Sequence, residues 1–126
     1  MNIDIKRVKI FVTIPLDSVG KVREAVCNAG AGIIGEYTFC TSSTKSIGTF
    51  IPSENANPHI GARNKLEFVE EEKLEFVCDV EKVKEVIEEL RKSHPYEEPA
   101  IDIIPLISIF ILISSINSKN FTIYIT

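Results

Sequence analysis

Residues 8–30, VKIFVTIPLDSVGKVREAVCNAG, decide the fold, because two different hydrophobic periods follow one another directly. Every second side chain from Val8 to Ile14 is β-branched and apolar, a period of two that predicts a strand with one buried face. After Pro15, Asp17 is suited to capping a helix, and apolar side chains then recur at spacings of three, four and three residues. This stripe consists of Val19, Val22, Val26 and Ala29. Gly30 is expected to end the helix.

A second strand-helix signal occupies the later part of the chain. Asp79 is expected to cap a helix that Pro95 ends, since proline lacks an N–H and forces His94 out of the helical region. The apolar stripe of this helix consists of Val80, Val83, Ile87 and Leu90, with Val86 at its margin. Ile101–Ile104 then returns as a last core strand. The order of elements predicts an α+β, ferredoxin-like fold, with one antiparallel sheet and both helices on one face.

Between the two helices the pattern is less regular. We expect a strand over Ile34–Thr41, a polar turn over Thr41–Ser46, a short strand over Gly48–Pro52 and a loop over Ser53–Gly61. The sequence KLEFV occurs at 65–69 and again at 73–77. An eight-residue offset suits two amphipathic strands, so this near-repeat predicts a hairpin joined through Glu70–Glu72.

Composition excludes several classes of protein. The chain has 126 residues, 44% hydrophobic and 25% charged, with a net charge of −4. These values are typical of one globular domain and argue against disorder and against a broad nucleic-acid-binding face. Cys27, Cys40 and Cys78 form no CxxC pair, and the N-terminus lacks the apolar core of a signal peptide. We therefore expect reduced thiols in a cytoplasmic protein.

The C-terminal tail differs from the rest of the chain. From residue 106 onward the only charged side chain is Lys119, and the apolar run Ile103–Ile113 is too short to span a membrane, which takes about 17–25 residues. We expect a folded domain over 1–106. The tail, 107–126, is either a hairpin of two strands or a segment outside the fold.

The richest candidate for chemistry is the segment His94-Pro95-Tyr96-Glu97-Glu98-Pro99. Two prolines restrict its backbone, which suits a polar ligand or a divalent metal because less entropy is lost on binding. A metal would take a nitrogen of His94 and an oxygen of Glu97 or Glu98. The alternative is a helix stop followed by an edge strand, with the glutamates in solvent.

Two further segments offer candidate ligand contacts. His59 either lines a pocket or lies on the surface of its loop. Gly48 and Thr49 form a glycine-containing bend whose backbone amides either bind an anion or only turn the chain.

Four stretches in a fixed order carry a resemblance to a known family: AGAGIIGEY at 29–37, GTFIP at 48–52, NPHIG at 57–61 and HPYEEPAID at 94–102. Together, over about residues 7–106, they resemble the CutA-like domain inserted in YqfO-type members of the Nif-three-like (NGG-one-interacting factor three) family, which also exists as a free-standing protein. The HPYE stretch also resembles CutA, a trimeric protein linked to divalent-metal tolerance. The fold is related to that of the PII signalling proteins, which are trimers that bind small effectors between subunits.

The resemblance implies a ferredoxin-like fold and a homotrimer. A small-molecule effector is a further expected partner, whereas the net charge and the short apolar run argue against a nucleic-acid partner and a membrane span. It does not imply the activity of full-length family members, because their His-rich metal motifs are absent. The leading hypothesis is a non-catalytic, oligomeric binding or regulatory domain. Its ligand site at subunit edges would be lined by Gly48, Thr49, His59, His94, Tyr96, Glu97 and Glu98. The alternative is a divalent-metal-binding protein of CutA type that uses His94 and Glu98, or Glu97 in its place.

Overall fold

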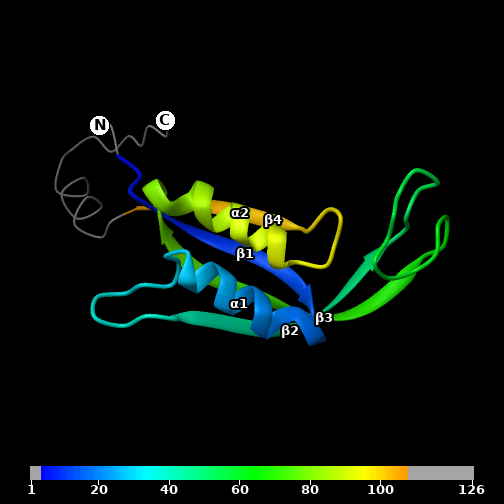
Figure 1. Ribbon diagram of the computed structural model, residues 1–126, viewed down its shortest axis with the longest axis horizontal. Helices are drawn as coiled ribbons and strands as arrows, with labels where there is room; N and C mark the ends of the chain where they lie inside the picture. Colours follow the sequence, from blue (N-terminus) through cyan, green and yellow to red (C-terminus); the bar gives the residue numbers. More distant parts are fainter. Residues whose placement is uncertain (1–3, 108–126) are drawn as a thin grey trace, which may run out of the picture.

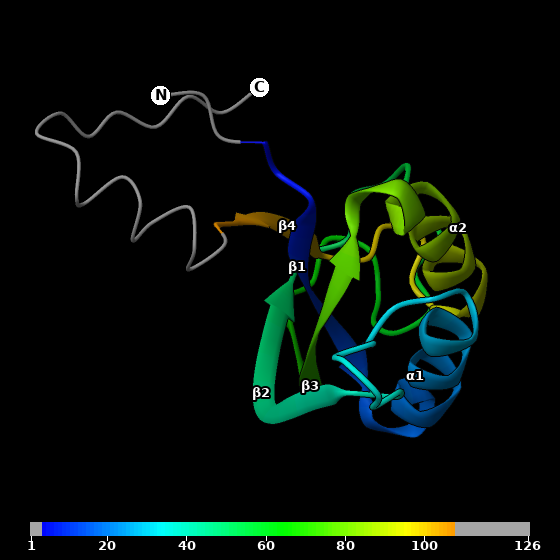
Figure 2. The same ribbon diagram turned by 90° about the vertical axis from the view of Figure 1, so that its left-hand side faces the viewer.

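The computed structural model describes residues 4–107, which form one antiparallel sheet covered on one face by two helices (Figure 1). The elements are β1 (Arg7–Pro15), α1 (Val19–Asn28), β2 (Thr41–Phe50), β3 (Glu67–Asp79), α2 (Val83–Ser93) and β4 (Ile101–Leu106). The strand order is β2-β3-β1-β4, and all three pairings are antiparallel. Figure 2 shows both helices on the same side of the sheet. The predicted α+β, ferredoxin-like arrangement is therefore confirmed.

The core lies between the sheet and the helices, and its first half matches the sequence periods. The alternate positions of β1 from Val8 to Ile14 are buried, as is the predicted stripe of α1. On α2 the stripe is shifted from the prediction: Val86 is fully buried, whereas Val80 is 44% exposed. The reason is that Val80 lies in a 3-10 turn, Val80–Lys82, whose geometry differs from that of the following helix.

The predicted hairpin over 65–77 is wrong, because residues 67–77 belong to one continuous strand, β3, of 13 residues. The predicted strand over Ile34–Thr41 is also wrong: residues 34–40 form a loop with a single bridge between Ile34 and Tyr37, and Thr41 begins β2. The polar stretch that follows is not a turn but the first half of β2. Polar Ser and Thr side chains suit β2 because it is an edge strand with one side unpaired and a largely exposed surface.

Part of the β2–β3 hairpin extends beyond the helices. β3 pairs with β1 as far as Pro15↔Glu71, and its residues 67–70 pair with β2 alone. Figure 1 shows these ends of β2 and β3, with their connecting loop 51–66, projecting past the helices. The predicted loop over Ser53–Gly61 is confirmed within this connection.

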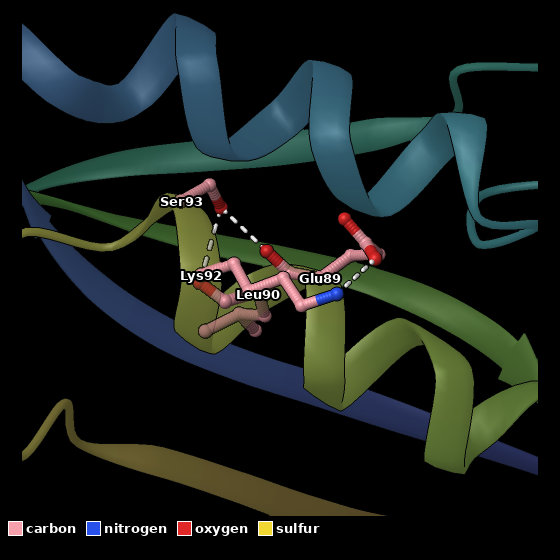
Figure 3. Close-up of polar contacts among 4 residues, drawn as sticks. All are labelled: Glu89, Leu90, Lys92 and Ser93. Atoms are coloured by element: carbon pink, nitrogen blue, oxygen red, sulfur yellow. Dashed lines mark hydrogen bonds and ion pairs between the residues drawn. The ribbon is translucent and has the colours of Figure 1, made fainter.

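The end of α2 directs the chain toward the functional residues. Ser93 Oγ donates to the carbonyl oxygens of Glu89, at 2.9 Å, and Leu90, at 3.0 Å, while Lys92 pairs with the Glu89 carboxylate at 3.2 Å (Figure 3). His94 then adopts extended φ and ψ angles of −81° and 135°, as the following proline requires. This confirms the predicted end of the helix.

The two predicted N-terminal caps do not form. Neither helical segment has a side-chain capping bond at its start. Asp17 Oδ1 accepts a hydrogen bond from the Ser18 hydroxyl, and Asp79 Oδ1 forms an ion pair with Arg7 Nε at 3.8 Å. In both places a 3-10 turn precedes the α-helix, so the aspartate is not adjacent to the first helical amides.

The last described strand is an edge strand and not a core strand. Ile103 and Ile104 of β4 are 45% and 47% exposed. β4 ends at Leu106, and the predicted tail hairpin lies outside the described residues. None of the helices in residues 4–107 is long and apolar enough to cross a membrane.

Candidate functional site

A cavity of about 510 Å³ lies where the projecting hairpin meets the segment between α2 and β4. It brings together Tyr96, Glu97 and Glu98 with Gly48, Thr49 and His59, which are all of the candidate residues except His94. The other lining residues are Thr13, Ser46, Phe50, Ile51, Pro52, Ser53, Ala56, Pro58, Ile60, Glu71 and Ala100. Four segments distant in sequence therefore build one site.

His94 lies beneath this cavity as a structural residue. It is 6% exposed, and its Nε2 lies 2.8 Å from the carbonyl oxygen of Thr13 in β1. Its Nδ1 accepts a hydrogen bond from the Tyr96 N–H at 3.1 Å. Because a carbonyl oxygen can only accept, Nε2 carries the proton and the ring is neutral. Burial lowers the pKa of His94, which agrees with this state.

These contacts bear on the metal hypothesis. Both ring nitrogens of His94 are engaged in hydrogen bonds, so ligation would require one of them to break. Within residues 4–107 no three His, Cys, Asp or Glu side chains are grouped as metal ligands. Metal binding stays an untested prediction.

The sequence interpretation missed Glu71, the most deeply buried acidic residue of the site. Glu71 is 5% exposed, and the Tyr96 hydroxyl donates to its Oε2 at 2.7 Å. Burial and this hydrogen bond raise the pKa of Tyr96, so the phenol stays protonated and donates. The bond joins β3 to the segment after α2.

Gly48 leaves the space that the Glu71 carboxylate occupies, and the predicted bend at this glycine is wrong. Residue 48 lies within β2, opposite Val69, and not in a bend. A methyl group at this position would overlap Oε1 of Glu71 and approach its Cδ to 2.9 Å. A glycine inside a strand often marks such a close approach, and this is the signal from which a buried neighbour of residue 48 could have been inferred.

Further contacts hold the walls of the cavity together. Glu97 Oε2 accepts a hydrogen bond from the Asn57 N–H at 2.9 Å, which ties the loop after β2 to the segment after α2. The rings of Phe50 and Tyr96 lie 6.2 Å apart at 58°. Within the loop, Asn64 N–H donates to the Pro52 carbonyl at 2.6 Å. The site is thus shaped by contacts between its own walls.

The charge of the lining is uneven. Three carboxylates, those of Glu71, Glu97 and Glu98, face no lysine or arginine in the lining, and His59 is its only basic side chain. The remaining surface is largely apolar and comes from aromatic, proline, isoleucine and alanine residues. The lining therefore offers carboxylate acceptors and the hydroxyl groups of Thr13, Ser46, Thr49 and Ser53 beside an apolar wall.

Comparison with known proteins places this domain within larger relatives. No protein-family model matches the chain. It is 48% identical over 98 residues to the GTP cyclohydrolase 1 type 2 homolog of Halalkalibacterium halodurans, a match that covers 78% of this chain and 26% of the relative. The structure of a Bacillus cereus protein related to NIF3 superposes with a TM-score of 0.70 at 37% identity, covering 81% of this chain and 26% of that one.

A more distant likeness supports the fold alone. The periplasmic divalent cation tolerance protein CutA from Archaeoglobus fulgidus has a TM-score of 0.58 at 20% identity, covering 79% of this chain and 83% of that one. The predicted resemblance to a CutA-like domain of NIF3-related proteins is confirmed. The chain spans about a quarter of the length of the NIF3-related proteins that it matches.

Proposed function

We propose that residues 4–107 form a non-catalytic, regulatory domain that binds a small molecule in the cavity between the β2–β3 hairpin and the segment after α2. The observation that carries this proposal is that four distant segments meet around a space of about 510 Å³. Small-molecule sites generally have volumes of about 300–1,000 Å³ and combine an apolar lining with a few polar groups. The cavity has both properties.

The fixed walls favour binding. The contacts of His94 with Thr13, of Tyr96 with Glu71 and of Asn57 with Glu97 hold three sides of the cavity in place. A site whose walls are already ordered loses less conformational entropy when a ligand binds.

The states of the described cysteines and of His94 support a non-catalytic role. No cysteine lines the cavity, and burial raises the pKa values of Cys27 and Cys78, the latter to about 11. His94, the buried histidine, has both nitrogens committed to hydrogen bonds and none free to act as a base. The same three free thiols support our proposal of a cytoplasmic location.

We propose self-association as a homotrimer. Within residues 4–107 the sheet ends at β2 and β4 with no further strand paired to either, and large apolar side chains are exposed on or beside the hairpin and on β4. They include Ile47, Ile51, Phe68, Ile103 and Ile104. Unpaired edges and exposed apolar side chains are features that association covers. Sedimentation equilibrium at protein concentrations from about 1 to about 100 μM should show a trimer. A monomer at all of these concentrations would refute the proposed homotrimer.

The test of ligand binding uses amide chemical shifts. A library of small fragments is titrated into ¹⁵N-labelled protein, and the proposal expects some fragments to shift amides of the cavity, such as those of Gly48, Thr49 and Glu98. Ala56→Phe, which fills part of the cavity, should abolish these shifts. Ala62→Phe, an exposed position in the same loop outside the lining, is the matched control. If no fragment shifts the cavity amides, the proposed function is wrong.

Divalent-metal binding through His94 with Glu98, or Glu97 in its place, is a second candidate, favoured by the proximity of these residues in one short segment. Affinity should then fall at pH values below about 6.5, because burial lowers the pKa of His94 and its imidazole gains a proton only there. His94→Ala should abolish binding. Elemental analysis of the two purified proteins tests this, and equal metal content in both would remove the candidate.

A further inference from the structure

We infer that the cavity selects an organic cation, a compound with a protonated amine on an apolar body, and that Glu71 is the residue that recognises the ammonium group. This inference rests on the proposed function, because it names the class of ligand for the same site. It is carried by the position of one carboxylate oxygen, by the charges around it and by the apolar surface beside it.

Oε1 of Glu71 is the free acceptor in the cavity. The Tyr96 hydroxyl bonds to Oε2, and no side chain or backbone amide of residues 4–107 donates to Oε1. In the same residues every buried side-chain nitrogen or oxygen has a partner, so Oε1 is open to solvent although Glu71 as a whole is 5% exposed. Oε1 lies against Gly48, and both Gly48 and Glu71 line the cavity. A buried carboxylate with one free oxygen is best satisfied by a charged N–H donor.

The charges of the lining favour the same sign of ligand. Glu97 and Glu98 add two carboxylates, and no lysine or arginine of the lining balances them. An anionic ligand would be placed next to three negative charges in a partly desolvated site, where repulsion is stronger than in water. A cationic group would be attracted by all three.

The apolar wall specifies the rest of the ligand. Phe50, Ile51, Pro52 and Ile60 line the cavity beside the carboxylates. Phe50 and Tyr96 also present aromatic rings, whose faces attract cations. A strongly hydrated inorganic cation gains nothing from contact with this apolar surface, whereas an aliphatic or aromatic amine buries its hydrocarbon part against it.

The test compares three probes with the same body and different polar groups: phenethylamine, 2-phenylethanol and 3-phenylpropionate. Each is titrated into ¹⁵N-labelled protein at pH 7, and Kd is taken from the shifts of the cavity amides. We expect phenethylamine to bind about tenfold more tightly than either analogue, a difference that corresponds to about 1.4 kcal/mol.

Two variants locate the effect. Glu71→Gln keeps the shape and can still accept from Tyr96, but it lacks the charge, and it should weaken phenethylamine about tenfold. Glu72→Gln removes the same charge from the neighbouring residue, which does not line the cavity, and should leave Kd within about twofold. The comparison of the three probes on the unmodified protein does not depend on the folding of either variant.

Each result has one meaning. Equal binding of the three probes, or tighter binding of the acid, overturns the cation inference and leaves the proposed function in place. Equal weakening by the two variants overturns the role of Glu71. If none of the three probes binds while other library fragments shift the cavity amides, the inference alone fails. If nothing in the library binds there, the proposed function fails with it.

Discussion

Replacing Gly48 by alanine should destabilise the domain, although the same change usually stabilises a strand. Alanine in an unstrained strand position gains about 0.5–1 kcal/mol over glycine. At position 48, however, the new methyl group would overlap Oε1 of Glu71. The carboxylate ends a flexible side chain and can swing away, but only by giving up its 2.7 Å hydrogen bond to Tyr96.

The magnitude follows from that bond. A hydrogen bond to a charged group contributes about 1.5–3 kcal/mol. Subtracting the gain of about 0.5–1 kcal/mol leaves Gly48→Ala less stable than the unmodified protein by about 0.5–2.5 kcal/mol. In a Tyr96→Phe background the bond is already absent, so the same substitution should cost little or become stabilising. The two substitutions should therefore be coupled by about 1.5–3 kcal/mol.

The assay is urea unfolding of the four proteins of this cycle, with Gly20→Ala as the control. Gly20 lies in α1 with no atom within 4 Å of an added methyl group, so alanine there should stabilise by about 0.5–1 kcal/mol. A Gly48→Ala protein as stable as the unmodified one, or a cycle without coupling, would show that Glu71 is not held as described.

Three other outcomes follow from the site and the core. Burial lowers the pKa of His94 in the folded state, so the unfolded chain takes up the proton first as the pH falls. The stability that His94 contributes is therefore present above about pH 6.5 and decreases below it. In His94→Gln, the midpoint of urea unfolding should depend less on pH than in the unmodified protein. Burial raises the pKa values of Cys27 and Cys78, so a thiol reagent at pH 8 should modify the half-buried Cys40 first. Mass spectrometry of partly labelled protein measures the order of modification, and earlier labelling of Cys27 or Cys78 would contradict this prediction. Glu97→Ala should change the free energy of unfolding by less than about 1.5 kcal/mol, yet accelerate exchange of the Asn57 amide hydrogen several-fold, since its acceptor is lost.

The sequence alone determined the elements whose signals are local. The period of two in β1, the stripe of α1 and the proline that ends α2 each depend on neighbours within a few residues, and all three are present in the structure. The order of these elements was enough for the fold class, because few topologies bury two single-faced helices on one sheet. Local sequence also singled out six residues that line the cavity, but it missed others, Glu71 above all, and it included His94, which lies outside the lining.

Only the tertiary structure decided what depends on distant partners. β3 is one strand because it pairs with the flanking strands β1 and β2. These pairings include residues 70–72, the acidic run that was predicted to be a turn. Glu71 became part of the site because Gly48 leaves room for it and Tyr96 reaches it from 25 residues away. His94 was singled out by its neighbours in sequence, and the structure adds a hydrogen bond from its ring to the Thr13 carbonyl, 81 residues away. No local pattern records these contacts, since each pairs residues that meet only when the sheet has formed.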